Sequence, residues 1–170
     1  MPSPIAHALA GAAIARLAPT RRHVIACATL AAVPDVDLLL PIMHRTVTHS
    51  VTAVGVTLII AASVTGGVTR WKTAGLYALA YGSHLLLDWL GADPNPPFGI
   101  QMFWPFSNRW FISGADLFPP TIRGLVTRAT MLQNLRAVAV EVAIILPIVS
   151  ILWVVLRPRD GATSSNRVIG

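Results

Sequence analysis

Long apolar segments alternate with short polar clusters along the chain. Between Arg45 and Arg70 lie 24 residues without a formal charge, and residues 137–156 form a second long apolar stretch. Each is long enough for a helix that crosses a hydrocarbon core of roughly 30 Å. Residues 73–90 form a third such stretch. The pattern therefore predicts several membrane-embedded helices.

Two shorter apolar stretches, 4–15 and 23–33, are each about three helical turns long, which is too short to span a bilayer alone. We expect half-buried helices, or tilted ones that the longer spans shield. The five stretches together predict an all-α integral membrane protein with about four to five helices. The last of them, at 137–157, is expected to be a C-terminal transmembrane helix.

The segment 91–136 is the one long connection. All five Phe residues of the chain fall between Phe98 and Phe118. Such crowding is typical of a membrane interface, where aromatic rings settle at headgroup depth; a small satellite core under a loop is the alternative. We therefore expect a membrane-embedded domain at 1–136 with an aromatic interfacial loop at 91–136, followed by the transmembrane helix and a flexible polar tail at 158–170.

The composition agrees with a membrane location. Hydrophobic residues make up 54% of the chain and charged residues 12%, about half the charged share of a soluble domain. The formal net charge is +6, but the arginines are scattered singly or in pairs. Nucleic-acid binders cluster their cations on one face, so we expect the lipid bilayer, and no nucleic acid, as the partner. Cys27, the one cysteine, has no partner for an internal disulfide and is expected to be buried.

Ionisable residues are rare in membrane segments, so each one suggests a function. Here they occur in sets at the ends of the apolar stretches. The sequence PDVD closes the second stretch, HRTVTHS precedes the third, and GSHLLLD ends the fourth. The candidates for metal binding are His7, Asp35, Asp37, His44, His49, His84 and Asp88.

The spacing of the candidates indicates that they act together. His84 and Asp88 are four residues apart, so in a helix they project from one face and can share a metal ion. If successive helices alternate in direction, all seven candidates lie on the same side of the membrane. His23 follows two arginines at a basic turn and has no other candidate ligand near it in the sequence, so we leave it out of the metal-binding set.

Imidazole and carboxylate groups are ligands for zinc, manganese or iron. The cluster suits one divalent ion, with zinc the first choice, or two ions with shared carboxylates. One of Asp35, Asp37 or Asp88 is a candidate general base instead of a ligand. Thr48 and Ser50 are expected to orient the His or Asp side chains.

Arg45 lies between the ligand candidates. Its planar guanidinium suits the clamping of a phosphate or carboxylate group, and an ion pair with an Asp of the cluster is the alternative. Arg109 and Trp104, in the aromatic segment, are further candidates for substrate binding.

These motifs, in this order, resemble the YdjM-like family of inner-membrane, metal-dependent hydrolases over roughly residues 4–107. The most specific part is HRTVTHS beside PDVD. The family's motif residues match the seven His and Asp candidates, Arg45, Thr48, Ser50 and the element Trp104-Pro105-Phe106. Family members often carry a Thr near the position of Gly91 here. The resemblance implies a helical membrane protein with a hydrolytic metal site whose rim differs at Gly91.

The expected function is metal-dependent hydrolysis of a phosphoester or ester in a lipid or lipid-linked substrate, because a divalent ion lowers the pKa of bound water. A metal-ion transporter is one alternative, although transport sites tend to lie near the bilayer midplane and these candidates gather at helix ends. A non-catalytic membrane protein that uses a structural metal to pin short helices is another.

Helices that alternate in direction also predict how the protein is oriented in a cell inner membrane, which the chain is expected to cross several times. The side opposite the cluster receives eight cations and the cluster side five. By the positive-inside rule the cluster then faces the periplasm. A re-entrant hairpin of the two short stretches would keep the cluster together but would put Arg21 and Arg22 at membrane depth. The eight cations are Arg16, Arg21, Arg22, Arg70, Lys72, Arg157, Arg159 and Arg167.

Overall fold

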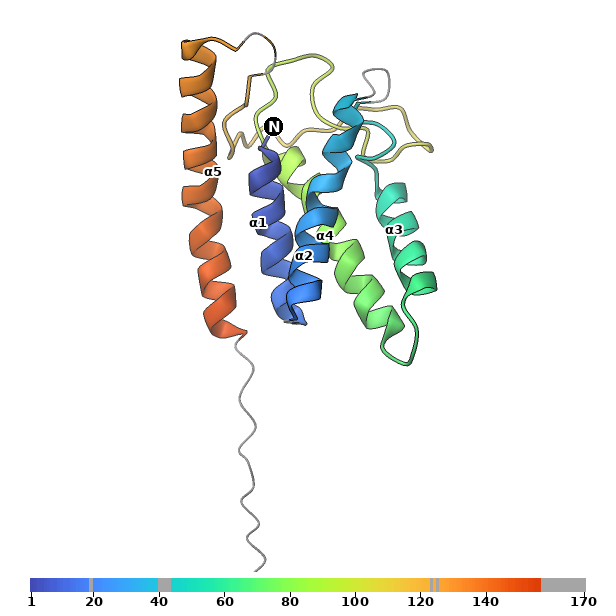
Figure 1. Ribbon diagram of the computed structural model, residues 1–170. Coiled ribbons are helices and arrows are strands. Elements are labelled where there is room, and N and C mark those ends of the chain that lie inside the picture. The colour runs from blue at the N-terminus through green and yellow to red at the C-terminus, as the bar shows by residue number, and fades with distance from the viewer. Residues whose placement is uncertain (19, 40–43, 123, 125, 157–170) are drawn as a thin grey trace, which may run out of the picture.

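The computed structural model describes residues 1–18, 20–39, 44–122, 124 and 126–156. Within these residues there is no β-strand, and two isolated β-bridges link parts of the connection after the fourth helix. The all-α prediction is therefore confirmed (Figure 1). The helices are α1 (Pro4–Ile14), α2 (Arg21–Ala32), α3 (Val51–Val64), α4 (Arg70–Leu90) and α5 (Arg128–Val155), with 3₁₀ helices at Ala15–Leu17 and Val33–Leu39.

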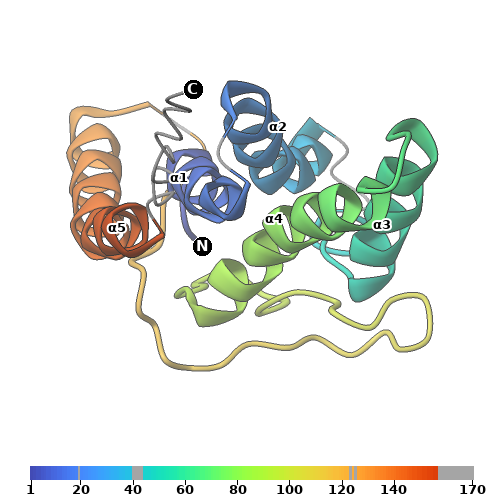
Figure 2. The ribbon, with the colours of Figure 1, turned by 90° about the horizontal axis from the view of Figure 1, so that it is seen from below.

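The five α-helices stand side by side along a common axis. Helix α4 packs against α1, α2 and α3, and α5 lies alongside α1 (Figure 2). Helix α1 begins, and α4 ends, at the upper end of the bundle in Figure 1, where the connection after α4 also lies. The helices alternate in direction, so the polar sequence motifs at their ends meet at this upper end.

Short polar side chains set the helix starts. Ser3, Thr20 and Ser50 accept hydrogen bonds from backbone N–H groups in the first turns of α1, α2 and α3. Such caps satisfy donors that have no partner within the helix. The predicted stretches 4–15 and 23–33 agree with α1 and α2.

The long uncharged region before Arg70 forms a shorter helix than the sequence predicts. Helix α3 has 14 residues, about 21 Å at the usual rise, so the prediction of a full crossing helix from 24 uncharged residues was wrong. The physical reason is that HRTVTHS folds into a turn-rich loop, and Ser50 caps the helix directly after it. At the other end the helix stops at Thr65, before a Gly-Gly turn.

Helix α5, with 28 residues, is the one helix in the described part of the chain that is long and apolar enough to cross a membrane. Only 11% of its most apolar window is buried, so most of its surface is available to lipid. It begins at Arg128, earlier than the expected 137, because Thr127 and Thr130 form a reciprocal capping box. The tail expected at 158–170 lies outside the described residues.

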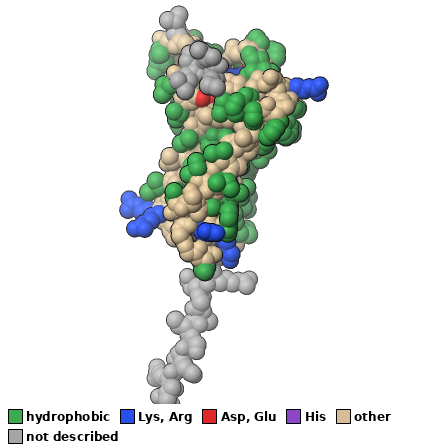
Figure 3. Space-filling view, turned by 90° about the vertical axis from the view of Figure 1, so that its right-hand side faces the viewer, with side chains coloured by type: hydrophobic (Ala, Val, Ile, Leu, Met, Phe, Trp, Pro, Cys, Tyr) green, Lys and Arg blue, Asp and Glu red, His purple; other side chains and the backbone are tan. Residues whose placement is uncertain are grey.

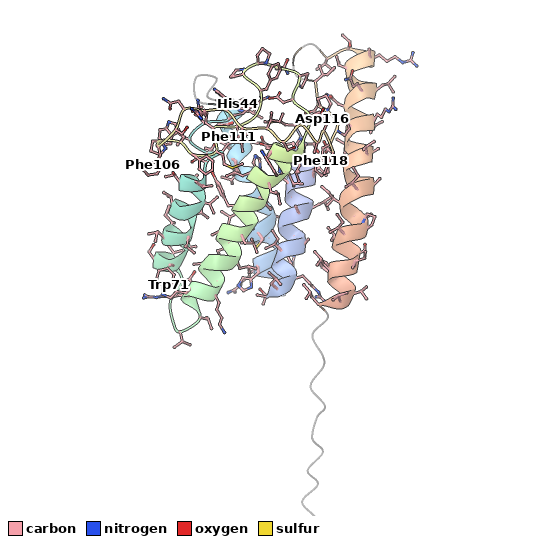
Figure 4. The ribbon with its side chains drawn as sticks, turned by 180° about the vertical axis from the view of Figure 1, so that it is seen from behind. His44, Trp71, Phe106, Phe111, Asp116 and Phe118 are labelled. Atoms are coloured by element: carbon pink, nitrogen blue, oxygen red, sulfur yellow. The ribbon has the colours of Figure 1, made fainter. Side chains whose placement is uncertain are left out.

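The aromatic segment divides between core and surface. Phe118 is 3% exposed and packs with Ala6 and Ile145, whereas Phe106 is 88% exposed. Phe106 and Trp71 mark opposite ends of the bundle (Figure 4). Most Lys and Arg side chains visible in Figure 3 gather toward the lower end, away from the upper connection.

Helices α1 and α2 approach so closely that one position needs glycine. A Cβ placed on Gly11 would overlap the carbonyl group of Cys27 and lie 2.7 Å from the Cβ of Ala31. Cys27 is fully buried at this crossing, as predicted. The contact leaves no room for any other side chain.

We predict that Gly11→Ala lowers the free energy of unfolding by about 1–3 kcal/mol, because overpacking forces the backbones apart. The matched control is Gly75→Ala in α4, where an added Cβ meets no atom within 4 Å and the higher helix propensity of Ala acts alone. Thermal unfolding in detergent checks both variants. A Gly11→Ala protein as stable as the control would contradict the close crossing.

Candidate metal centre

Three separate segments bring fully buried ionisable side chains to one point at the upper end of the bundle. His7 comes from the first turns of α1, His49 from the loop before α3, and His84 and Asp88 from the last turns of α4. The three imidazoles are 0% exposed and Asp88 is 1% exposed. The convergence that alternating helices imply is thus present for these four residues.

The carboxyl group of Asp88 is the centre of this group. Its Oδ2 lies 3.2 Å from Nε2 of His49 and 3.2 Å from Nε2 of His84, while its Oδ1 lies 3.4 Å from Nε2 of His7. The two Nε2 atoms of His49 and His84 are themselves 3.0 Å apart. The spacing of four residues between His84 and Asp88 therefore places both on one face of α4, as the sequence predicts.

Hydrogen bonds on the far side of two rings leave the Nε2 atoms available. Nδ1 of His84 lies 2.7 Å from the carbonyl oxygen of Ala31, so it carries the proton and donates it there. Nδ1 of His49 lies 3.1 Å from Oδ2 of Asp37 and 2.9 Å from Oγ1 of Thr48. This pattern, in which a carboxylate or carbonyl orients the ring from behind, is common to metal-binding histidines.

The donor atoms form two groups whose members lie within 4.8 Å of one another, namely His49–His84–Asp88 and His7–Asp35–His84. Asp35 Oδ1 is 3.9 Å from Nε2 of His84. Because Nδ1 of His84 is engaged with Ala31, both groups depend on the same Nε2 atom. A single ion is therefore a better fit than two ions.

The buried polar atoms at the centre are also suited to a divalent cation. Both oxygens of Asp88 and both ring nitrogens of His7 are buried, and none finds a hydrogen-bond partner of good geometry among the described residues. Unpaired buried polar atoms are costly. Lone pairs that converge on one point without bonding one another are the arrangement that a divalent cation satisfies.

Asp37 organises the loop that carries His49. Its carboxyl oxygens lie 2.6 Å from Nδ1 of His44 and accept hydrogen bonds from the hydroxyl of Thr48 (2.6 Å) and the backbone N–H of Arg45 (2.9 Å). Arg45 has a φ of 62°, a left-handed conformation that costs a non-glycine residue about 1–3 kcal/mol. Its bond to Asp37 offsets that cost.

The electrostatics of this pair favour opposite charges. Burial acts to raise the pKa of Asp37, but hydrogen bonds from His44, His49 and Thr48 outweigh it and hold the pKa well below its usual range. Burial acts to lower the pKa of His49, but the carboxylates of Asp37 and Asp88 outweigh it and raise the pKa to about 9. Without a metal, a protonated His49 supplies the positive charge that the carboxylates require.

Arg45 forms an ion pair with Asp93, with Nη1 2.5 Å from Oδ2, and its Nε donates to Nε2 of His44 at 3.2 Å. The predicted alternative, an ion pair of Arg45 with an acid, is therefore present, but the acid belongs to the 91–127 connection and not to the predicted cluster. A cavity of about 310 Å³ opens beside this pair, lined by His44, Arg45, Asp93 and Trp110 among others. Figure 4 shows His44 at the upper end, beside the connection.

Several residues that the sequence predicted for metal or substrate binding lie outside the donor groups or outside the lining of the cavity. His44 and Asp37 belong to neither group of donors; they contact each other and the Arg45 loop. Ser50 caps α3 and donates to the carbonyl of Val47. Neither Trp104 nor Arg109 is among the described residues that line the cavity.

Sequence reasoning missed three residues of this region. Asp93 and Trp110 border the cavity, but the 91–127 connection has no periodicity from which their positions follow. Glu141 in α5 is fully buried. The sequence did carry a signal for Glu141, because a lone acid in an apolar span suggests a function.

His23, which the sequence analysis leaves out of the metal-binding set, contacts the carbonyl of Ala18 through Nδ1 at 2.8 Å.

The fold and the site together define an all-helical membrane protein with a buried cluster of His and Asp at one end of its bundle. The family model of the YdjM inner membrane proteins matches residues 1–159, and the chain belongs to this family. No curated protein and no solved structure shows significant similarity to the chain.

We predict that the metal-free protein loses stability as the pH rises from about 6.5 to about 9. The pKa of His49 is raised in the folded state from its ordinary value of 6.5 to about 9, so its protonation stabilises the fold fully below pH 6.5 and not above pH 9. Thermal unfolding in detergent and chelator at three pH values measures this. His49→Gln is expected to flatten the dependence; an equal slope in both proteins would contradict it.

Proposed function

We propose that this protein is a membrane-bound, metal-dependent hydrolase. The single observation that carries the proposal is the buried carboxyl group of Asp88, which three imidazole Nε2 atoms surround at 3.2–3.4 Å. A set of histidines and carboxylates without thiolate suits zinc, with manganese or iron as alternatives. When bound, such an ion supplies Lewis acidity that makes water a nucleophile at neutral pH.

His49, His84 and Asp88 are the proposed ligands of one ion. Two His and one carboxylate leave a fourth position open, which is the usual pattern of catalytic zinc sites. His7 and Asp35 complete the surroundings, and either can occupy a further position. Asp37, His44 and Thr48 hold His49 and its loop in place.

Asp35 is the proposed general base. Among the three candidate carboxylates its side chain is the most accessible, at 12% exposed against 3% for Asp37 and 2% for Asp88. A base has to reach a proton on water in the presence of substrate. The other two carboxylates are committed to imidazoles and backbone groups.

Arg45 and the cavity beside it are the proposed binding site for the polar part of the substrate. A volume of about 310 Å³ lies at the lower end of the range for small-molecule pockets, which suits a headgroup better than an acyl chain. The guanidinium favours an anionic oxygen. A phosphoester of a lipid or lipid-linked molecule fits these features, and a carboxylic ester is the alternative. Trp104 and Arg109 stay candidates for contacts at the membrane interface.

The cavity also supports a catalytic role over a structural one. Structural metal sites are closed. The cavity that His44 and Arg45 line lies one ring away from this cluster, because the imidazole of His44 packs edge-on against that of His49, with ring centroids 5.9 Å apart. The position of the cluster at one end of the bundle favours hydrolysis over ion transport, for which a midplane site is expected.

We also propose that α1–α4 lie in the bilayer with α5, and that the cluster faces the periplasm. Large apolar side chains on α3 and α4, such as Ile59, Ile60 and Leu86, are more than half exposed. Arg16, Arg21, Arg22, Arg70 and Lys72 lie around the opposite end of the bundle, which suits the cytoplasmic surface.

Metal binding is tested with the double variant His84→Ala, Asp88→Ala. We expect the wild-type protein, purified without chelator, to carry about one equivalent of divalent metal and to cleave phosphoester substrates in mixed micelles. The double variant is expected to lose both. Metal content by mass spectrometry, with Arg22→Lys as the control, measures this, and a wild-type metal content in the double variant would sink the proposal.

The role of Arg45 is tested by Arg45→Lys. The change keeps the charge but removes the planar fork, so we expect kcat/KM to fall by roughly 10- to 100-fold, equivalent to about 1.4–2.8 kcal/mol. Expression and metal content are expected to hold. The control is Arg22→Lys at the opposite end of the bundle. Unchanged turnover in the Arg45→Lys protein would remove Arg45 from the substrate site.

The orientation is tested with reporter fusions placed after Leu156. A reporter that is active only in the cytoplasm is expected to be active there, because α5 starts at the cluster side and runs to the other. Activity of a reporter that works only in the periplasm would overturn the orientation. A fusion in the 91–127 connection is expected to give the opposite pattern.

A further inference from the structure

Glu141 is a fully buried acid in the middle of an apolar helix. It belongs to the stripe Ala137, Glu141 and Ile145, whose spacing of four residues turns one face of α5 toward the rest of the bundle. A buried carboxyl group in such a helix is costly unless hydrogen bonds compensate it. The contacts that Glu141 makes therefore indicate what it contributes.

Both oxygens of Glu141 accept hydrogen bonds from one residue, Ser3. The backbone N–H of Ser3 donates to Oε1 at 3.0 Å, and the hydroxyl of Ser3 donates to Oε2. Ser3 is the N-cap of α1, since its Oγ accepts from the N–H of Ala6 at 3.4 Å and its carbonyl accepts from the N–H of His7 at 3.3 Å. Glu141 thus holds the point at which α1 begins.

His7 lies one turn after this point, and its polar neighbour is Asp88, whose Oδ1 lies 3.4 Å from Nε2 of His7. Both of its ring nitrogens lack a hydrogen-bond partner of good geometry in the part of the chain that the structure describes. Its ring stacks on that of His84, with centroids 3.7 Å apart and an angle of 22° between the planes. His49 and His84, in contrast, are each oriented by a hydrogen bond to Nδ1.

The position of His7 consequently depends on the placement of α1. Lower down, α5 meets α1 through the packing of Ile145 on Ala6, and Arg16 lies over the ring of Trp153 at 5.0 Å. These contacts keep the two helices side by side. Among these contacts between α1 and α5, the hydrogen bonds between Ser3 and Glu141 lie next to the metal centre.

We propose that Glu141 is a positioning residue for the metal centre: by binding Ser3, helix α5 fixes the start of α1 and with it the imidazole of His7. Helix α5 is then a working part of the site as well as a membrane anchor. The metal-binding part of this inference rests on the proposed function, and the placement of His7 does not.

The first test compares Glu141→Leu with Glu141→Gln, with Ser150→Ala, an exposed position in the same helix, as the control. Co²⁺ is the probe, because its visible absorption reports the ligand geometry. We expect Glu141→Leu to bind Co²⁺ roughly 10- to 100-fold more weakly, the range found for partners that orient metal ligands, and with an altered spectrum. Glu141→Gln, whose amide still pairs with Ser3, is expected to recover most of both. Unchanged affinity and spectrum in Glu141→Leu would overturn the inference.

The second test separates positioning from helix stability and applies even where Glu141→Leu does not fold. Ser3→Ala and Thr20→Ala each remove one helix N-cap, the first from α1 and the second from α2. We expect only Ser3→Ala to weaken Co²⁺ binding and change its spectrum. Equal effects of the two variants would overturn the positioning role.

A metal-independent measurement distinguishes this inference from the proposed function. Spectra of protein labelled with ¹⁵N-histidine, assigned with His7→Gln, report the surroundings of the His7 ring without any metal. A shifted His7 signal in Glu141→Leu but not in Ser150→Ala supports the inference, and an unshifted signal overturns it. A wild-type protein that takes up no Co²⁺ would refute the metal centre while leaving this comparison intact.

Discussion

A carboxyl group buried inside a helical bundle has to be matched by positive charge, and this constraint governs the upper end of the molecule. Asp88 is 1% exposed and its near neighbours are the imidazoles of His7, His49 and His84. Removing one partner of a buried charge pair leaves an uncompensated charge. A proton on an imidazole supplies this charge without metal, and a divalent ion supplies it more completely, so metal binding and proton release are expected to be linked.

The loop after α2 meets the same constraint a second time, one layer farther out. Asp37 gathers His44, Thr48 and the backbone of Arg45 around one carboxyl group, and through Nδ1 of His49 it connects this loop to Asp88. The hydroxyl of Tyr81 ties α4 to the same loop by donating to the carbonyl of Thr48 at 2.7 Å. Polar contacts between different segments thus hold the centre in place, and no single helix can make these contacts alone.

Sequence patterns predicted the helices and the pairing of His84 with Asp88, because these features depend on local periodicity. The alternation of the helices was an assumption, with which the structure agrees. The patterns did not predict that α3 would be short, because HRTVTHS is shaped by Asp37 and Tyr81, which are distant in sequence or on other elements. For the same reason His44, although close to His49 in sequence, bonds Asp37 and Arg45 and belongs to neither group of candidate metal donors. Asp93 and Trp110 follow from the path of an irregular connection, which has no periodic signal.

The central claim is that one metal ion lies between His49, His84 and Asp88. Anomalous diffraction from crystals of the zinc-loaded protein, recorded on both sides of the zinc absorption edge, tests it most directly. The account predicts a single strong peak within about 2.0–2.2 Å of Nε2 of His49, Nε2 of His84 and a carboxyl oxygen of Asp88. A peak bound instead by His44 and Asp37, or no peak near Asp88 in fully loaded crystals, would contradict it.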